Sequence, residues 1–251
     1  MHFESITTHI SRLKVPFEDL YTAVFLFESK GKYLLFDTAT TASDVTECIL
    51  PALEAMSAFP EYLVCSHLHE DHAGGLSSLA KAFPDSAVAV FSQNYTLDGR
   101  TVHYLSDGER LLERFCVVHL PGHTEDSIAL YDTVDRVLVT ADCLQLYGVS
   151  RYGTGVTRPA DYRDSLARVR ALSPEVIIAS HEYVPYGSVA RGAQEIGHCL
   201  DACEAALSLA EGLIDQFPAC SCEELAAHYK MAHPQLPPVG AWTFDSLQKA
   251  Q

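Results

Sequence analysis

Basic residues are scarce in this sequence of 251 residues. Lys and Arg together number 17 against 33 Asp and Glu, which gives a formal net charge of −16. Such a negative field repels phosphate backbones and anionic lipid surfaces, and only a local basic patch would escape this argument. We therefore expect neither nucleic acid nor a membrane as a partner.

Long apolar runs are also missing. No stretch approaches the roughly 20 residues that a helix needs to cross a bilayer. The first residues, MHFES, lack the basic segment and apolar core of a secretory signal. The eight cysteines are scattered in apolar or helical contexts, which fits reduced thiols. We expect a cytoplasmic protein, and 48% hydrophobic residues suffice for a large buried core.

Extended and helical patterns alternate along the chain. Residues 21–27 and 32–37 predict a hairpin that is closed by a Gly-containing turn. Residues 43–58 and 73–83 predict helices. Strands of four to seven residues are predicted at 87–91, 114–120, 127–131, 136–141 and 175–180.

Potential metal ligands are concentrated in one short segment. Residues 67–72 read His-Leu-His-Glu-Asp-His and follow a short apolar run. Imidazole and carboxylate groups suit zinc, iron or manganese, and three His with one Asp at this density are not explained by packing. In an extended chain His67 and His69 point the same way, while Asp71 and His72 lie where a helix begins. One segment can therefore supply ligands to two neighbouring metals.

Three further candidates follow the ends of predicted strands. His123 comes after a Pro-Gly turn that can swing its imidazole into a cleft. Asp142 ends the strand predicted at 136–141, and His181 follows the one at 175–180. Because side chains at strand ends gather where sites are built, we expect these three to join the first segment.

With these residues the chain resembles the metallo-β-lactamase superfamily. The resemblance is carried by the HxHxDH segment at residues 67–72, by His123 in a PGHT context, and by Asp142 and His181 after apolar strands. It covers roughly residues 20 to 185. It implies an α+β fold, a four-layer αββα sandwich with a metal site at one edge of two sheets.

The same resemblance implies a ligand set for two divalent metal ions, with zinc expected first and iron or manganese as alternatives. It implies that the first metal is held by His67, His69 and His123, the second by Asp71, His72 and His181, and that Asp142 bridges them. A water shared by two cations ionises near neutral pH, and the hydroxide would attack an electrophilic carbonyl. Asp71 and Asp142 are the expected catalytic carboxylates, and Asp71 would orient the nucleophile.

A loop that starts at Asp142 must border the site. Within it, aromatic and cationic side chains stand out in an otherwise acidic protein, and the glycines give mobility. We predict that substrate is contacted by at least one of Tyr147, Arg151, Tyr152 and Arg158. The alternative is that the arginines pair with surface carboxylates.

The character of the sequence changes after the last predicted ligand. We expect a catalytic core over residues 1–187 and a helical extension over 188–251, with helices at about 188–213 and 221–232. Such an extension resembles the arrangement in glyoxalase II-like and quinolone-signalling thioesterase-like proteins, where these helices shape the substrate entrance. Dimerisation through the helices, to give a homodimer, is an equal interpretation.

The leading hypothesis is a dinuclear metal-dependent hydrolase of a small-molecule thioester or ester. Lactone hydrolysis of the N-acyl homoserine lactonase kind would use the same ligands, and a phosphodiesterase is a further alternative. Two other classes stay open. A mononuclear iron oxygenase of the same fold would need fewer ligands, and a non-catalytic regulatory protein would keep the site only to bind a ligand.

Overall fold

The computed structural model describes residues 1–18, 20–146, 155–183 and 187–250. The chain divides into two compact units, Met1–Val118 and His119–Gln251. Its strands belong to a seven-stranded sheet made of β1–β7 and a six-stranded sheet made of β8–β13. Two mixed sheets with accompanying helices confirm the α+β class that the sequence predicts. Among these described residues, none of the helices has the length and apolarity that a bilayer crossing requires.

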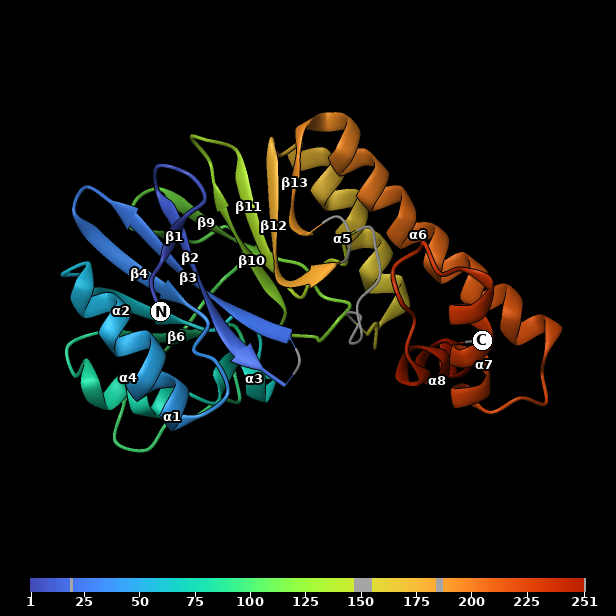
Figure 1. Ribbon diagram of the computed structural model, residues 1–251, viewed down its shortest axis with the longest axis horizontal. Helices are drawn as coiled ribbons and strands as arrows, with labels where there is room; N and C mark the ends of the chain where they lie inside the picture. The colour runs from blue at the N-terminus through green and yellow to red at the C-terminus, as the bar shows by residue number, and fades with distance from the viewer. Residues whose placement is uncertain (19, 147–154, 184–186, 251) are drawn as a thin grey trace. The chain divides into compact units, whose positions relative to one another are not determined.

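The first unit is built on the seven-stranded sheet (Figure 1). Its strands are β1 (Glu4–Ser5), β2 (Ile10–Phe17), β3 (Leu20–Ser29), β4 (Lys32–Phe36), β5 (Pro60–Val64), β6 (Ala87–Val90) and β7 (Val102–Tyr104). Strands β1 to β4 pair antiparallel, whereas β4 to β7 pair parallel. The hairpin predicted at 21–27 and 32–37 is confirmed as β3 and β4. A short antiparallel pair, β8 (Arg110–Leu111) and β9 (Phe115–His119), follows.

Helices of the first unit fill the connections between its parallel strands. They are α1 (Ala42–Asp44), the π-helical turn η1 (Val45–Ile49), α2 (Leu50–Ala55), α3 (Glu70–Ala73) and α4 (Leu76–Ala82). Thr41 begins the first of them with a capping box, in which its side chain accepts from the Asp44 backbone and Asp44 accepts from the Thr41 backbone. The apolar faces of η1, α2 and α4 share one buried cluster with β2 to β6, so the sheet and its helices form one core.

The second unit combines a four-stranded portion of sheet with helices. It contains β10 (Ile128–Asp132), β11 (Val137–Ala141), β12 (Val176–Tyr183), β13 (Gly187–Arg191), α5 (Pro159–Leu172), α6 (Gly192–Gln216), α7 (Cys222–Ala232) and α8 (Ala241–Ala250). Strands β11 and β12 pair parallel, with α5 in the connection between them, and the other neighbours pair antiparallel. In Figure 1 α5 and α6 run beside each other, next to β12 and β13.

Two predictions about the end of the chain need correction. The helix predicted from residue 188 begins later, because Gly187–Arg191 forms β13 and pairs with β12 in the register Ile177↔Ala190. Alternating buried residues satisfy a strand there, as Ser188 and Ala190 are buried. The final segment, for which no helix was predicted, forms α8. The expected boundary at residue 187 between core and extension stays a prediction.

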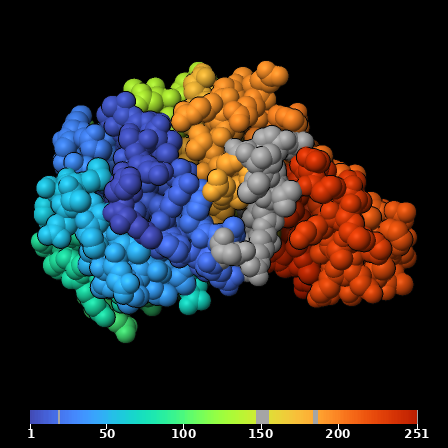
Figure 2. All heavy atoms as spheres, viewed as in Figure 1, coloured from blue at the N-terminus to red at the C-terminus, as the bar shows by residue number. Residues whose placement is uncertain are grey.

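The last three helices pack on one another. Residues of α6, α7 and α8 share a buried cluster that includes Ala210, Tyr229 and Phe244, and in Figure 2 the red atoms from the end of the chain lie against the orange atoms that precede them. Ser221 opens α7 with a second capping box to Glu224. Because α8 is amphipathic and short, this packing rather than its own propensity accounts for its stability.

Candidate functional site

The ligand-rich segment of the first unit lies where β5 ends and α3 begins. His69 is the N-cap of α3, with the extended dihedrals φ −65° and ψ 148°, so the chain is still extended up to this point. The imidazole rings of His67 and His69 have centroids 4.6 Å apart, as expected for alternate residues of an extended chain. The His67 ring is also 4.4 Å from that of His72. The three imidazoles therefore gather at one place.

Two glycines let this segment approach the end of β4. A Cβ on Gly74 would lie 1.9 Å from the carbonyl oxygen of Thr40, and one on Gly75 would lie 2.1 Å from that of Thr38. Only glycine fits so near to backbone. Thr38 donates from its backbone N and from its Oγ1 to the His72 carbonyl, both at 2.8 Å. Helix α3, and with it His72, is thereby fixed against the chain that leaves β4.

Asp37 is a site residue that sequence reasoning missed. Its Oδ2 lies 2.8 Å from His72 Nδ1 and accepts from Ser66 Oγ at 3.0 Å. Its Oδ1 accepts from the Ser66 backbone N at 2.7 Å. A proton on Nδ1 donated to this carboxylate makes Nε2 the metal-binding atom of His72. That Nε2 lies 3.4 Å from Oδ2 of Asp71. The signal was an aspartate directly after the apolar run of β4, the pattern that drew attention to Asp142.

Asp71 is held by a neighbouring strand. Its Oδ2 accepts a hydrogen bond from Thr22 Oγ1 of β3 at 3.2 Å. The Asp71 side chain is 17% exposed, while His72 beside it is fully buried. One carboxylate oxygen of Asp71 thus has a fixed orientation next to the imidazole of His72.

In the second unit a close backbone contact positions His123. Gly122 has φ +142°, and a Cβ on it would lie 2.6 Å from the Cβ of Tyr162 in α5. The Gly122 carbonyl accepts from the backbone N of Thr157 at 2.8 Å. His123 Nδ1 lies 2.7 Å from the carbonyl oxygen of Gly155, so the Nδ1 proton is donated there and Nε2 is available as the ligand atom. That the Pro-Gly turn swings this imidazole into a cleft stays a prediction.

Asp142 lies between two imidazoles. Its Oδ2 is 4.0 Å from His123 Nε2 and 3.3 Å from His181 Nε2. Two irregularities of the sheet produce this arrangement. The β11–β12 register shifts between Val139 and Ala141, and Ala141 has φ +46°, a conformation that non-glycine residues rarely adopt. The backbone thereby turns immediately before Asp142.

The donor set of these residues fits divalent metal ions. The first unit contributes His67, His69, Asp71 and His72 as candidate ligands, and the second unit contributes His123, Asp142 and His181. Neutral imidazoles with carboxylates suit zinc, iron and manganese. The Nδ1 atoms of His72 and His123 have their own acceptors, and the Nδ1 atom of His67 is 3.0 Å from Ser66 Oγ. Such outer partners are what orient histidine ligands in metal sites.

The predicted substrate contacts lie mostly outside the described residues. Tyr147, Arg151 and Tyr152 belong to residues 147–154, which lie outside the described residues. Arg158 is half exposed and pairs with Asp161, and its Nη1 is 3.9 Å from Glu125. This pairing is the one that the alternative interpretation expects of the arginines. A substrate contact by Arg158 stays a prediction.

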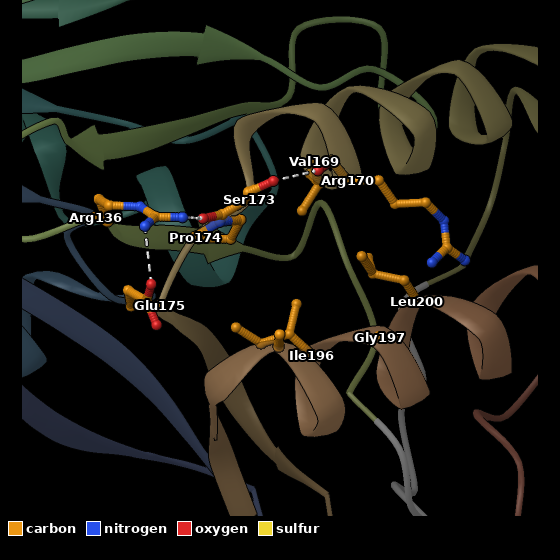
Figure 3. A pocket seen from close by; sticks show the side chains of 10 residues that line it. Arg136, Val169, Arg170, Ser173, Pro174, Glu175, Ile196, Gly197 and Leu200 are labelled. Atoms are coloured by element: carbon orange, nitrogen blue, oxygen red, sulfur yellow. Dashed lines mark hydrogen bonds and ion pairs between the residues drawn. The ribbon is translucent and has the colours of Figure 1, made fainter.

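A cavity of about 290 Å³ in the second unit is separate from these ligands (Figure 3). Its apolar lining includes Ile196 and Leu200 of α6, and Arg136 spans one side with an ion pair to Glu175 at 2.9 Å. Arg136 precedes β11, whereas Asp142 follows that five-residue strand, so they are separated by about 20 Å of extended chain. The cavity therefore does not belong to the candidate metal site.

Comparisons with known proteins agree with this geometry. The family model of the metallo-beta-lactamase superfamily matches residues 18–90, which include the ligand-rich segment. A solved metallo-beta-lactamase family protein from Thermus thermophilus has the same fold, with a TM-score of 0.71 over 97% of this chain and 92% of that one at 18% identity. The chain is therefore similar in sequence over residues 18–90, and in fold over most of its length, to the metallo-beta-lactamase superfamily.

Further similar proteins extend the comparison. The metallo-beta-lactamase DIM-1 gives a TM-score of 0.66 at 16% identity, over 82% of this chain and 97% of that one. These two structures confirm the metallo-β-lactamase fold that the sequence resemblance implies. Among curated proteins, the hydroxyacylglutathione hydrolase of Klebsiella pneumoniae subsp. pneumoniae is 29% identical over 68% of this chain and 65% of its own length. That of Salmonella typhi is 30% identical over 66% and 63%. The chain therefore spans just under two thirds of the length of these two curated proteins.

Proposed function

We propose that this protein is a dinuclear metal-dependent hydrolase that cleaves a small thioester. The observation that carries the proposal is the position of Asp142, whose Oδ2 lies within 4.0 Å of the Nε2 atoms of both His123 and His181. These two imidazoles are themselves held in place, that of His123 by the hydrogen bond of its Nδ1 to Gly155 and that of His181 by the position of its backbone in β12. A carboxylate between two such imidazoles is suited to bridge two cations. An isolated structural aspartate would need only one such neighbour.

The proposed ligand sets follow the superfamily resemblance. One metal would be held by His67, His69 and His123, the other by Asp71, His72 and His181, with Asp142 shared. Two bound divalent ions, zinc in our proposal, would supply a water that ionises near neutral pH and positive charge for the carbonyl oxygen. The chain itself must hold its ligands in place, since a site that is loose by about 1 Å loses much of its rate.

The roles of the two carboxylates differ. One oxygen of Asp71 accepts a hydrogen bond from Thr22 Oγ1 at 3.2 Å. This bond fixes the plane of the carboxylate, which would let Asp71 accept a proton from the nucleophilic water. Asp142 is nine-tenths buried between its imidazoles and holds negative charge where the cations would meet. Asp37 keeps the His72 imidazole in the tautomer that presents Nε2.

The thioester substrate class is supported by the curated relatives. Both are named hydroxyacylglutathione hydrolase, an activity on a glutathione thioester. We extend to this chain only the bond that is cleaved, a thioester, because less than two thirds of each relative is matched. A lactone or phosphodiester substrate would use the same ligands, and the panel below separates these from a thioester.

The proposal is tested by metal analysis combined with a substrate panel. Purified protein is assayed for metals by elemental analysis, then for hydrolysis of an acylglutathione, a simple acyl thioester, an N-acyl homoserine lactone and a phosphodiester, before and after chelation. We expect about two zinc ions per chain and chelator-sensitive hydrolysis of the thioesters. One iron per chain would favour an oxygenase, and two metals without turnover would favour a regulatory binding protein. Activity that survives complete chelation would overturn the proposal.

A further inference from the structure

Trp242, the only tryptophan of the chain, lies against a proposed metal ligand. It is the second residue of α8, and its ring meets the imidazole of His123 edge to face, with centroids 5.8 Å apart and an interplanar angle of 84°. Edge-to-face contacts at this distance are favourable between aromatic rings. Helix α8 therefore reaches the candidate site through this residue.

The indole is seated on glycine backbone. A Cβ on Gly155 would lie 1.7 Å from Cε2 of Trp242, and a Cβ on Gly240 would lie 2.6 Å from its Nε1. Gly155 is also the residue whose carbonyl oxygen lies 2.7 Å from His123 Nδ1. One short segment thus contacts both rings, the imidazole by a hydrogen bond and the indole by close packing.

Helix α8 is anchored next to this contact. The backbone N of Val156 donates to Thr243 Oγ1 at 2.8 Å, and Thr243 is buried. Phe244, the next residue, is fully buried in the cluster of α6, α7 and α8. The base of α8 is therefore fixed, and Trp242 has little freedom to move away from His123.

The indole nevertheless keeps an open surface, since Trp242 is 42% exposed. The rest of the ring is packed against His123, Gly155 and Gly240. The large apolar face of an indole gains from leaving water, so its exposed part is suited to be covered by an apolar group. An uncharged, polarisable face beside a metal ligand favours an apolar or aromatic group over a charged one.

We propose that Trp242 is a positioning and specificity-determining residue, which orients His123 and forms an apolar wall for the acyl group of the substrate. The proposal rests on the hydrolase function proposed above. A metal held by Nε2 would lie about 2.1 Å from that atom. The indole packs on Gly155, which bonds Nδ1 of the same ring, so a substrate at the metal would have to extend its acyl group past the His123 ring to reach the indole. The substrate class that fits is a thioester with an apolar acyl group, medium-chain or aromatic, in preference to acetyl.

The first test uses Trp242 as a reporter that does not depend on activity. With one tryptophan in the chain, emission excited beyond tyrosine absorption comes from Trp242 alone. Cobalt(II) added to chelator-treated protein should quench most of this emission in a saturable manner, and removal of the metal should restore it. Unchanged emission, with cobalt binding verified by elemental analysis, would overturn the placement of Trp242 beside the metal.

The second test measures acyl selectivity. Acetyl, octanoyl and benzoyl thioesters of one thiol are compared in the wild type, Trp242→Ala and Trp242→Phe. We expect Trp242→Ala to lower the octanoyl-to-acetyl ratio of kcat/KM by about tenfold, mainly through KM, which is what the loss of one aromatic contact produces. Trp242→Phe should restore the ratio to within about threefold. Met231→Ala, on α7 and 74% exposed, is the control and should leave it unchanged.

A binding measurement separates failure of this inference from failure of the proposed function. Non-hydrolysable thioether analogues with octanoyl-like and acetyl-like groups are titrated while Trp242 emission is followed. A response to the octanoyl analogue without turnover of any thioester would overturn the proposed hydrolase function and support the contact between Trp242 and the acyl group. Two results would overturn the role of Trp242 and support the hydrolase function. One is turnover with an unaltered octanoyl-to-acetyl ratio of kcat/KM in Trp242→Ala, and the other is an equal response to both analogues.

Discussion

His72 and Asp37 form a wholly buried pair in which Nδ1 of the imidazole lies 2.8 Å from Oδ2 of the carboxylate. The two residues are 35 positions apart, on α3 and at the end of β4. Asp37 has φ +68° and also accepts from the Ser66 backbone. A single carboxylate thus orients a proposed metal ligand and fixes the segment that leads to it.

Replacing Asp37 with Asn should weaken metal binding without unfolding the protein. Asn tolerates the left-handed backbone at this position, but a neutral amide orients and polarises the imidazole of His72 less well than a carboxylate. We expect a loss of affinity of about 10- to 100-fold, measured by competition with a chromogenic chelator. Asp245→Asn, which removes the surface pair with Lys249, is the control. Equal affinities for the two variants would show that Asp37 is structural only.

His69→Ala and Asp142→Ala should each abolish metal-dependent turnover. Both residues are proposed ligands, and loss of a direct ligand should cost more than about the hundredfold seen for outer partners. Initial rates and bound metal are measured together. His103→Ala serves as control, because His103 is half exposed and pairs with Glu109 at 2.6 Å. Full activity in either ligand variant would eliminate the dinuclear mechanism.

Gly122→Ala should destabilise the fold and disturb His123. The added Cβ would lie 2.6 Å from that of Tyr162, and the backbone has φ +142°. Strain and overpacking together should lower the free energy of unfolding by about 2 to 3 kcal/mol, measured by chemical denaturation.

Gly108→Ala isolates the backbone contribution to that effect. Gly108 has φ +80°, and a Cβ there would meet nothing within 4 Å. We expect a loss of about 1 kcal/mol and unchanged metal affinity. If the two variants are equally stable, the contact with Tyr162 does not constrain the turn before His123.

The thiol of Cys203 should make stability depend on alkaline pH. Its Sγ donates to the carbonyl oxygen of Gln145 at 2.8 Å, and burial raises its pKa from 9.0 to about 12. Between these values the folded chain keeps a proton that the unfolded chain has released, so stability present below pH 9 is lost as pH rises toward 12. The loss should be about 1 kcal/mol per pH unit.

Comparison with Cys203→Ala measures this contribution. Burial also raises the pKa of Tyr162 and of Tyr229, and Cys203 adds to both shifts, so the comparison measures the thiol together with its interaction with these tyrosines. Urea unfolding of each protein at neutral pH and near about pH 10.5 should give a smaller decline for Cys203→Ala. Parallel declines would mean that this thiol does not remain protonated in the folded chain.

Local patterns in the sequence predicted much of the architecture. The β3–β4 hairpin, α7 and the strands β6, β9, β10, β11 and β12 follow from periodicity and turn residues. These signals are local, because side chains alternate along a strand and recur every turn in a helix. Strand β13 and helix α8 were missed, since their formation depends on pairing with β12 and on packing against α6 and α7.

The sequence by itself determined the chemistry of the protein: the density of His and Asp at residues 67–72, the polar residues after apolar strands, and an acidic composition unsuited to nucleic acid. Tertiary structure alone decided which atoms those side chains present. Asp37 reaches His72 across 35 residues, and Trp242 reaches His123 across more than a hundred. Such contacts depend on how the elements pack, because the periodicity of a segment specifies its own buried face but not the partner that covers it.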